Sequence, residues 1–285
     1  MENQYEVNLQ SILKDVSKKG WLINLYMLVF QYFSTIYLTL LNPYSSAYIQ
    51  MIKILWIPLQ IIYIMVVWSL FKCFVSDPGR VPKHWQMFFG QQGRNRYCLL
   101  CHNYKPDRCN HCFECKRCVL NMDHHSFWIK NCVGYYNSKF YLLFWFYINL
   151  SATFSLIVVS LQIYPKIMNL FYRDDKQEIQ NQSNLPTLLL LLYLFVIAVL
   201  TLKSLIVRIK LAITNQTIIS QLDQRGQQDG QRFQYDIRYK FNQSFIVKEN
   251  WFQVMGTNPW LWPFPIYGQS GRPKGDGINW QRNQN

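Results

Sequence analysis

Residues 98–132 read CLLCHNYKPDRCNHCFECKRCVLNMDHHSFWIKNC and hold seven of the eight cysteines of this 285-residue chain. Pairs of cysteines separated by two residues occur four times in this run, and histidines and Cys132 accompany them. A two-residue gap lets both thiolates reach one tetrahedral zinc ion about 2.3 Å away. Six of the cysteines and two histidines would fill two four-coordinate sites, which are structural because no position remains for water. Bound metal would also stabilise a short segment that has little apolar core.

The run offers more candidates than two such sites need, so the spacing by itself leaves the choice of ligands open. We expect His102 and Cys109 to be surface or packing residues rather than ligands. If the run lies in the cytosol, its cysteines are reduced, and metal binding or catalysis is expected rather than disulfides.

Four uncharged apolar windows surround the run, at 21–41, 54–71, 140–164 and 185–202, and we extend the last span to residue 207. Each is about 18–25 residues long, which is the length needed to cross roughly 30 Å of hydrocarbon. The windows are apolar all round, whereas a core helix of a soluble protein is amphipathic. The sequence therefore predicts an α-helical polytopic membrane protein with four transmembrane helices.

The distribution of Lys and Arg predicts the orientation of these spans. Residues 1–20, 72–139 and 203–285 hold 25 of the 29 basic residues, and the two other loops hold four. By the positive-inside rule, both termini and the central loop are cytosolic. The net charge of +14 then faces the anionic lipid headgroups of the membrane. We therefore expect membrane lipids, and not nucleic acid, to be the partner of this charge.

The motifs in and around the run resemble those of the Asp-His-His-Cys (DHHC) protein S-acyltransferases, the palmitoyltransferases. Besides the run, the resemblance rests on FWIKNCVG at 127–134, DPG at 77–79, KPDR at 105–108 and NWFQVMG at 250–256. It covers most of the chain. It implies a membrane bundle of four helices with a cytosolic cysteine-rich domain at 72–139, flanked by the N-terminal segment 1–20 and the tail 208–285. The activity it implies is transfer of palmitoyl or similar acyl groups from acyl-CoA to cysteines of membrane-associated proteins, in an endomembrane (ER or Golgi) or the plasma membrane.

The resemblance also implies roles for individual residues. It implies two structural zinc ions, one held by Cys98, Cys101, His111 and Cys118, and the other by Cys112, Cys115, His125 and Cys132. His124 would be the general base and Asp123 would orient it, while the position of the nucleophile falls on Ser126. The residues alone are equally consistent with another role. In that role Asp123 is a carboxylate that orients His124 beside a structural metal ion.

Basic and aromatic residues near the run are candidates for binding acyl-CoA. Arg96, Lys105 and Arg108 could meet the CoA phosphates, since guanidinium groups suit phosphate well. The alternative is that these cations face lipid headgroups. Trp128 could contact the ligand, or it could be a packing or interfacial aromatic.

Two positions depart from the family pattern. Ser126 stands where the family has its nucleophilic cysteine, and Thr217-Ile218-Ile219-Ser220 stands where it has Thr-Thr-x-Glu. The second change removes a threonine and a glutamate, which are polar groups that would support the active site.

The chemistry of Ser126 leaves three readings open. A serine hydroxyl needs a well-placed base, which His124 and Asp123 could provide, but its oxyester is a poorer acyl donor to a thiol than a thioester is. The chain could be a weak or unusual acyltransferase, with the substrate thiol attacking acyl-CoA directly as one variant. It could instead be an inactive relative that binds acyl-CoA or client proteins. The third reading is a zinc module for partner recognition, which leaves the membrane spans and the Asp123-His124 pair unexplained.

Overall fold

The computed structural model describes residues 22, 25–36, 46–82, 85, 97–172, 185–222, 247–268, 273 and 275–278. They fall into two compact units. The cysteine-rich unit comprises 68–143 and 207–285 together with the N-terminal 1–21, and the helical unit comprises 22–67 and 144–206. Arg96, one of the predicted CoA-binding residues, lies outside the described residues.

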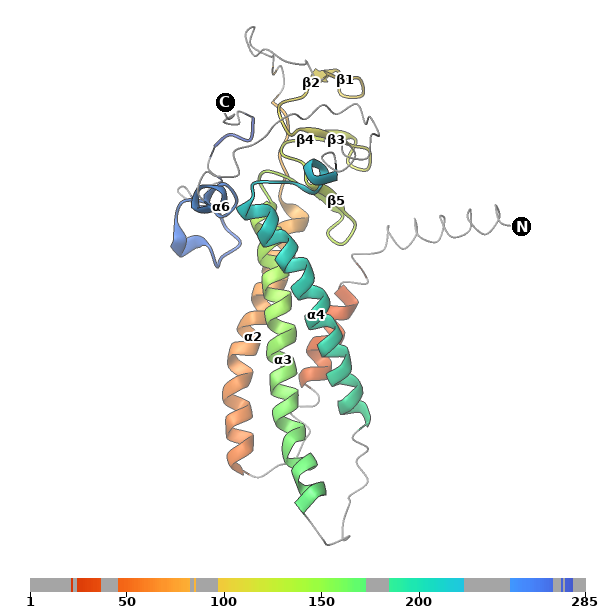
Figure 1. Cartoon of the computed structure of the whole chain (residues 1–285), viewed down its shortest axis with the longest axis vertical. Coiled ribbons are helices and arrows are strands. Elements are labelled where there is room, and N and C mark those ends of the chain that lie inside the picture. The colour runs from red at the N-terminus through yellow and green to blue at the C-terminus, as the bar shows by residue number, and fades with distance from the viewer. Residues whose placement is uncertain are drawn as a thin grey trace, which may run out of the picture. The chain divides into compact units, whose positions relative to one another are not determined.

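Three long helices, α2 (Ser46–Val75), α3 (Ser138–Tyr172) and α4 (Leu185–Ile213), contribute residues to both units (Figure 1). Each contains a stretch that is long and apolar enough to cross a membrane, namely Ile54–Val75, Ser138–Leu161 and Leu185–Ile213. A shorter apolar helix, Leu25–Ile36, falls within the first predicted span. The chain is therefore a polytopic membrane protein with a cysteine-rich part, as predicted.

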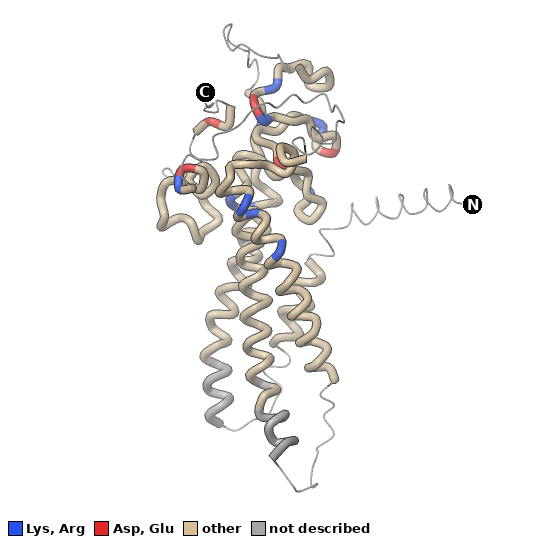
Figure 2. Tube along the Cα trace, in the orientation of Figure 1, with Lys and Arg blue, Asp and Glu red and all other residues tan. Residues whose placement is uncertain are grey.

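The helical unit is joined by polar contacts between its buried faces. The Gln31 side-chain amide donates to Ser151 Oγ, and the Asn149 amide donates to the Ala198 carbonyl and to Thr201 Oγ1. Such bonds satisfy polar groups that lipid cannot. Figure 2 shows the described helices of this unit without acidic residues, in keeping with their apolar sequence.

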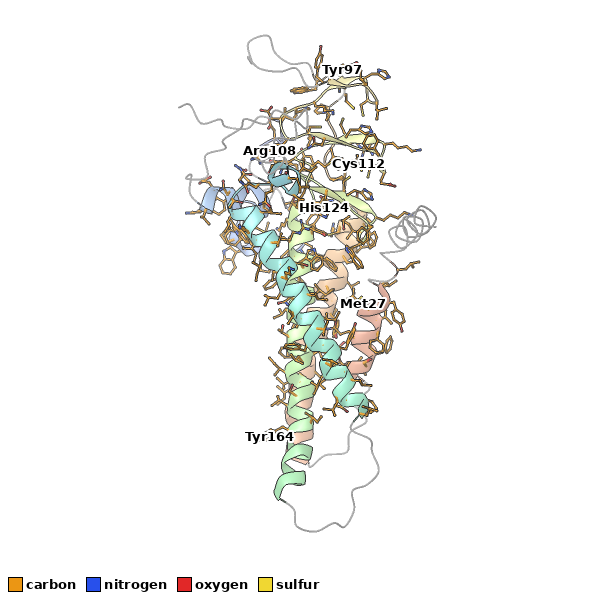
Figure 3. All side chains as sticks on the ribbon, turned by 45° about the vertical axis from the view of Figure 1, so that its right-hand side comes forward. Met27, Tyr97, Arg108, Cys112, His124 and Tyr164 are labelled. Atoms are coloured by element: carbon orange, nitrogen blue, oxygen red, sulfur yellow. The ribbon has the colours of Figure 1, made fainter. Side chains whose placement is uncertain are left out.

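The cysteine-rich unit contains three antiparallel hairpins that follow one another along the chain. They are β1 (Tyr97–Cys98) with β2 (Asn103–Tyr104), β3 (Asn110–Cys112) with β4 (Arg117–Val119), and β5 (His124–Ser126) with β6 (Asn131–Val133). Tyr97, Cys112 and His124 mark the successive hairpins in Figure 3, and the hairpins lie one above another in both views.

The three hairpins repeat one geometry every 14 residues. Tyr97 pairs with Tyr104, His111 with Cys118 and His125 with Cys132, so the register is the same each time. At the same place in each turn, His102, Lys116 and Lys130 adopt the left-handed conformation, with φ of 49°, 52° and 47°. Ser126 is thus the structural counterpart of Cys98 and Cys112, and Ile129 is the counterpart of Cys101 and Cys115. The third hairpin has the fold of a metal-binding Cys-x2-Cys turn without its two thiols.

The C-terminal segment also belongs to the cysteine-rich unit. Asn250 of α6 (Val247–Met255) donates to the Ile213 carbonyl, which would otherwise be unsatisfied at the end of α4. The fully buried ammonium group of Lys139 donates to the carbonyls of Leu261 and Ile266, on and just after the 3₁₀ turn η1 (Pro259–Leu261). The tail therefore packs on the ends of α3 and α4 that carry site residues.

Gly134 lies where the chain leaves β6 against the Asp-Pro-Gly loop at 77–79. A Cβ on Gly134 would come within 2.5 Å of the Pro78 carbonyl oxygen and 2.7 Å of Val119 Cγ1. The loop is held here by backbone hydrogen bonds from Tyr136 N to Pro78 O and from Leu120 N to Gly79 O. No side chain can therefore be accommodated unless these contacts move.

We expect Gly134→Ala to destabilise the protein by about 2–3 kcal/mol, because the overlap with backbone atoms forces the loop away from β6. Thermal unfolding of the purified protein in detergent measures the effect as a fall in Tm. Leu99→Ala, on an exposed hairpin turn, is the control and should leave Tm nearly unchanged. Equal Tm values for Gly134→Ala and wild type would show that the loop is not held at this contact.

Candidate active site and metal centres

Two groups of four side chains in the hairpins could each hold a metal ion. One consists of Cys98, Cys101, His111 and Cys118, and the other of Cys112, Cys115, His125 and Cys132. Within each group the ligand atoms lie within 4.8 Å of one another. Three sulfur atoms and one imidazole nitrogen form a common donor set for a four-coordinate metal. The grouping is the one that the resemblance implies.

Strand alternation explains why adjacent residues serve different groups. Successive side chains on a strand point to opposite faces. His111 and Cys112 are neighbours on β3, so His111 reaches the first group and Cys112 the second. The cross-strand partner of His111 is Cys118 in the first group, and that of His125 is Cys132 in the second. The interleaved assignment, which the spacing left open, follows from this register.

The thiols of the second group shift one another's pKa values. A hydrogen bond with Cys132, supported by His125 and the Cys115 N–H, lowers the pKa of the Cys112 thiol to about 3. The hydrogen bond with Cys112, together with burial, raises the pKa of Cys132. In the absence of a bound cation, the closely spaced thiols of this group therefore cannot all lose their protons. A bound divalent cation removes this conflict, because its charge deprotonates the coordinating thiols.

Asp123 and His124 form a hydrogen-bonded pair next to the second group. His124 Nδ1 lies 2.9 Å from Asp123 Oδ2. Since an ionised carboxylate only accepts hydrogen bonds, Nδ1 carries the proton and Nε2 is left as the basic nitrogen. Nε2 lies 3.4 Å from the Tyr141 hydroxyl on α3. The pair thus has the geometry of an oriented general base.

The Asp123 carboxylate has two further partners. Arg208 Nη1 on α4 lies 2.7 Å from Oδ2, and the backbone N–H of Ile218 donates to Oδ1 at 2.5 Å. Burial alone raises the pKa of Asp123, but the hydrogen bond from His124, the charge of Arg208 and the Ile218 N–H together hold it below its usual value. The carboxylate is therefore ionised at neutral pH and orients His124 rather than taking its proton.

Ser126 is 1% exposed, and its hydroxyl has no hydrogen-bond partner among the described residues. It lies two positions after His124 on β5, so the two side chains share the face opposite His125. Its cross-strand neighbour Asn131 donates to the Cys73, Phe74 and Ser76 carbonyls at the end of α2. Ser126 therefore lies in a hairpin that Asn131 ties to the end of α2, and no described residue bonds its hydroxyl.

The other predicted site residues have different surroundings. Arg108 is buried, and its two terminal nitrogens donate to Asn215 Oδ1 and O at 2.8 and 2.7 Å. Its guanidinium thus holds the turn after α4, and we do not retain it as a phosphate ligand.

Lys105 is half-buried beside the hairpins. Trp128 is also half-buried, and its ring contacts Phe127 with centroids 4.9 Å apart. His102 is exposed and Cys109 is buried, and neither belongs to a metal-binding group.

Sequence reasoning missed Arg208 and Tyr141, which contact Asp123 and His124. Tyr141 lies within the predicted third span and Arg208 just beyond the predicted fourth, and no local pattern marks either of them. It also missed the 14-residue repeat, although the equal spacing of positions 98, 112 and 126 was a signal that could have revealed it.

Comparison with known proteins gives consistent matches. The model of the DHHC palmitoyltransferase family matches residues 91–225. The probable protein S-acyltransferase 12 of Arabidopsis thaliana is 34% identical over 224 residues, covering 72% of this chain and 70% of the relative. Palmitoyltransferase ZDHHC15A of Danio rerio is 33% identical, covering 63% of this chain and 50% of the relative. Palmitoyltransferase PFA3 of Debaryomyces hansenii is 36% identical, covering 60% and 44%.

Proposed function

The chain belongs to the DHHC palmitoyltransferase family, and from this membership we propose that it transfers an acyl group from acyl-CoA to a cysteine of a membrane-associated protein. The acyl–sulfur bond of acyl-CoA breaks, an acyl–sulfur bond forms on the protein, and CoA leaves as a thiol. The observation that carries the proposal is the 2.9 Å hydrogen bond between Asp123 and His124 beside the buried hydroxyl of Ser126.

His124 is the proposed general base, with Nε2 as the atom that takes and returns the proton. Asp123 keeps the ring in this tautomer and favours its protonated form during the reaction. Ser126 occupies the position of the nucleophile. Once acylated, it would carry an oxyester, and transfer from an oxyester to a thiol is unfavourable. The proposed enzyme is therefore slow, and the limiting step is the departure of the acyl group from Ser126.

The two Cys/His groups are proposed to bind one structural zinc ion each. Each group supplies four protein ligands, so the ions would hold the hairpins together and take no part in the reaction. Because His125 is a ligand on β5, the second site would also fix the position of the strand that carries His124 and Ser126.

In the proposed topology the chain crosses the membrane four times, with spans at 21–41, 54–71, 140–164 and 185–207. The termini and the cysteine-rich domain at 72–139 lie in the cytosol, where acyl-CoA is available, and the excess of Lys and Arg in these segments supports this orientation. Lys105 and Arg96 are the proposed contacts for the CoA phosphates, and Trp128 is a proposed contact for the bound ligand. The membrane would be an endomembrane or the plasma membrane.

We expect His124→Ala to lower acyl transfer by about 100-fold or more, the usual contribution of a general base. The assay uses purified protein in lipid nanodiscs, labelled palmitoyl-CoA and a lipid-anchored substrate protein with one cysteine. His102→Ala is the matched control, an exposed histidine of the same unit outside both metal-binding groups. Equal rates for His124→Ala and wild type would remove His124 from the reaction. Absence of transfer by wild type would refute the activity itself.

A further inference from the structure

Arg208 binds the carboxylate that orients the proposed base. Its Nη1 lies 2.7 Å from Asp123 Oδ2, the oxygen that also accepts the hydrogen bond from His124 Nδ1. The side chains of Arg208 and Asp123 are only 15% and 11% exposed. A charged hydrogen bond that is this short and this well shielded from water restrains both partners strongly.

Arg208 also contacts the residue on the other side of His124. Its guanidinium lies over the ring of Tyr141, 5.0 Å from the centroid. The Tyr141 ring in turn meets the His124 imidazole edge-on at 5.5 Å, and its hydroxyl lies 3.4 Å from Nε2. Arg208 therefore holds Asp123 on the Nδ1 side of His124 and Tyr141 on the Nε2 side.

The Nε atom of Arg208 makes no hydrogen bond within the part of the chain that the structure describes. The side chain lines a cavity of about 60 Å³, together with Asn121, whose Oδ1 also lacks a hydrogen-bond partner among the described residues, and with Ser138 and Thr217. This volume is enough for ordered water, which would complete the bonding of these atoms. Among the described residues, the guanidinium thus contacts Asp123 and the Tyr141 ring, and each of these two residues contacts His124.

The segment 217–220 also contacts the Asp123 carboxylate, and its contact differs in kind from that of Arg208. With Ile218 and Ser220 in place of a threonine and a glutamate, the segment reaches Asp123 through the backbone N–H of Ile218. Ser220 Oγ bonds within its own turn, to the N–H and carbonyl of Thr217. The side chain that supports Asp123 from α4 is Arg208.

We infer that Arg208 is a positioning residue for acyl transfer, which holds Asp123 and Tyr141 so that His124 presents Nε2 to the reacting groups. The inference rests on the proposed function. Arg208 acts through Asp123, touches no reacting atom and contributes no metal ligand.

The test is a double-mutant cycle between Arg208→Met and Asp123→Asn, measured as kcat and KM for palmitoyl-CoA. We expect Arg208→Met to lower kcat by about 30-fold with little change in KM, because a misplaced base affects the reaction and not binding. In the Asp123→Asn background the same change should lower kcat by less than about 2-fold. Arg208→Lys should lower kcat less than Arg208→Met does, since lysine keeps the positive charge but lacks the planar guanidinium group.

Two controls separate positioning from a structural role. Lys210→Met removes an exposed cation from the same helix and should leave kcat unchanged. The metal content of Arg208→Met should equal that of wild type. If Arg208→Met lowers kcat by the same factor in both backgrounds, or lowers the metal content, the inference is wrong.

Thermal unfolding of wild type, the two single variants Arg208→Met and Asp123→Asn, and the double variant gives a measurement that does not depend on activity. If Arg208 and Asp123 act as a pair, the Tm of the double variant should be no lower than the Tm of the less stable single variant. If the fall in Tm of the double variant equals the sum of the two single falls, the pairing is contradicted. If wild type transfers no acyl group, the proposed function fails and with it the role of Arg208 in the reaction. The Tm values would still decide whether the pair exists.

Discussion

Replacing Ser126 by cysteine is expected to raise acyl transfer to a protein thiol by about 100-fold or more. A cysteine has a pKa near 8.5 and is already a few per cent thiolate at neutral pH, whereas a serine hydroxyl must lose its proton during the attack. The acyl-cysteine formed is a thioester, so its onward transfer to another thiol is energetically balanced. Ser126 is 1% exposed, and its counterparts in the other two hairpins are cysteines in the same register, so the larger sulfur fits this backbone.

The measurement follows labelled palmitoyl-CoA onto the enzyme and onto the substrate for wild type, Ser126→Cys and Ser126→Ala. In Ser126→Cys the enzyme-bound label should be released by neutral hydroxylamine, which cleaves thioesters. In wild type a label that resists hydroxylamine and disappears in Ser126→Ala identifies an oxyester at Ser126. Equal substrate acylation by wild type and Ser126→Ala would show that the substrate thiol attacks acyl-CoA directly. If only Ser126→Cys becomes labelled, the natural protein is an inactive relative that binds without turnover.

Loss of one ligand from the second metal-binding group is the other change with a large expected effect. Cys132→Ala should release one of two bound zinc ions per chain and abolish acyl transfer, because His125 of the same group lies between His124 and Ser126 on β5. Zinc binding is worth about 10–16 kcal/mol in small zinc modules. Its loss would therefore destabilise the hairpins that carry the ligands. Metal analysis of the purified protein and limited proteolysis within 97–133 measure the two effects.

Cys109→Ala is the matched control for this experiment. Cys109 and Cys132 are both 0% exposed, and the two substitutions remove the same atom. Only Cys132 belongs to a candidate metal-binding group, whereas the Cys109 thiol packs against Cys98 and Cys118 of the first group without being a ligand. Cys109→Ala should therefore keep two zinc ions per chain. If Cys132→Ala also keeps both ions, the ligand assignment of the second group is wrong.

The sequence was a good guide wherever the signal was local. The length and apolar character of a membrane span can be counted in one window, and three of the four predicted spans coincide with long apolar helices. Cysteines separated by two residues place two thiols at one metal through the turn that joins them. The departures at Ser126 and at 217–220 were also visible, since they are changes of residue type at positions that neighbouring motifs identify.

The sequence was a poor guide wherever a contact joins distant segments. Arg108 was expected at the CoA phosphates because it is basic and near the run, but it binds Asn215, which lies 107 residues away. Arg208 was counted only as a basic residue beyond the fourth span, yet it binds Asp123 across 85 residues. Which cation meets which acceptor depends on how α4 packs on the hairpins, and residue type does not reveal that packing.

By itself, the sequence determined that this protein is a membrane protein with a cysteine-rich part that has the ligand spacing of metal sites, because hydrophobic length and ligand spacing are properties of short segments. Spacing alone left open how the candidate ligands group, and only the tertiary structure decided what surrounds His124. The alternation of side chains on paired strands sends His111 and Cys112 to different candidate groups and places His124 and Ser126 on the face opposite His125. The packing of α3 and α4 then brings Tyr141 and Arg208 to the Asp123-His124 pair. Such contacts exist only after the chain has folded, so no local pattern encodes them.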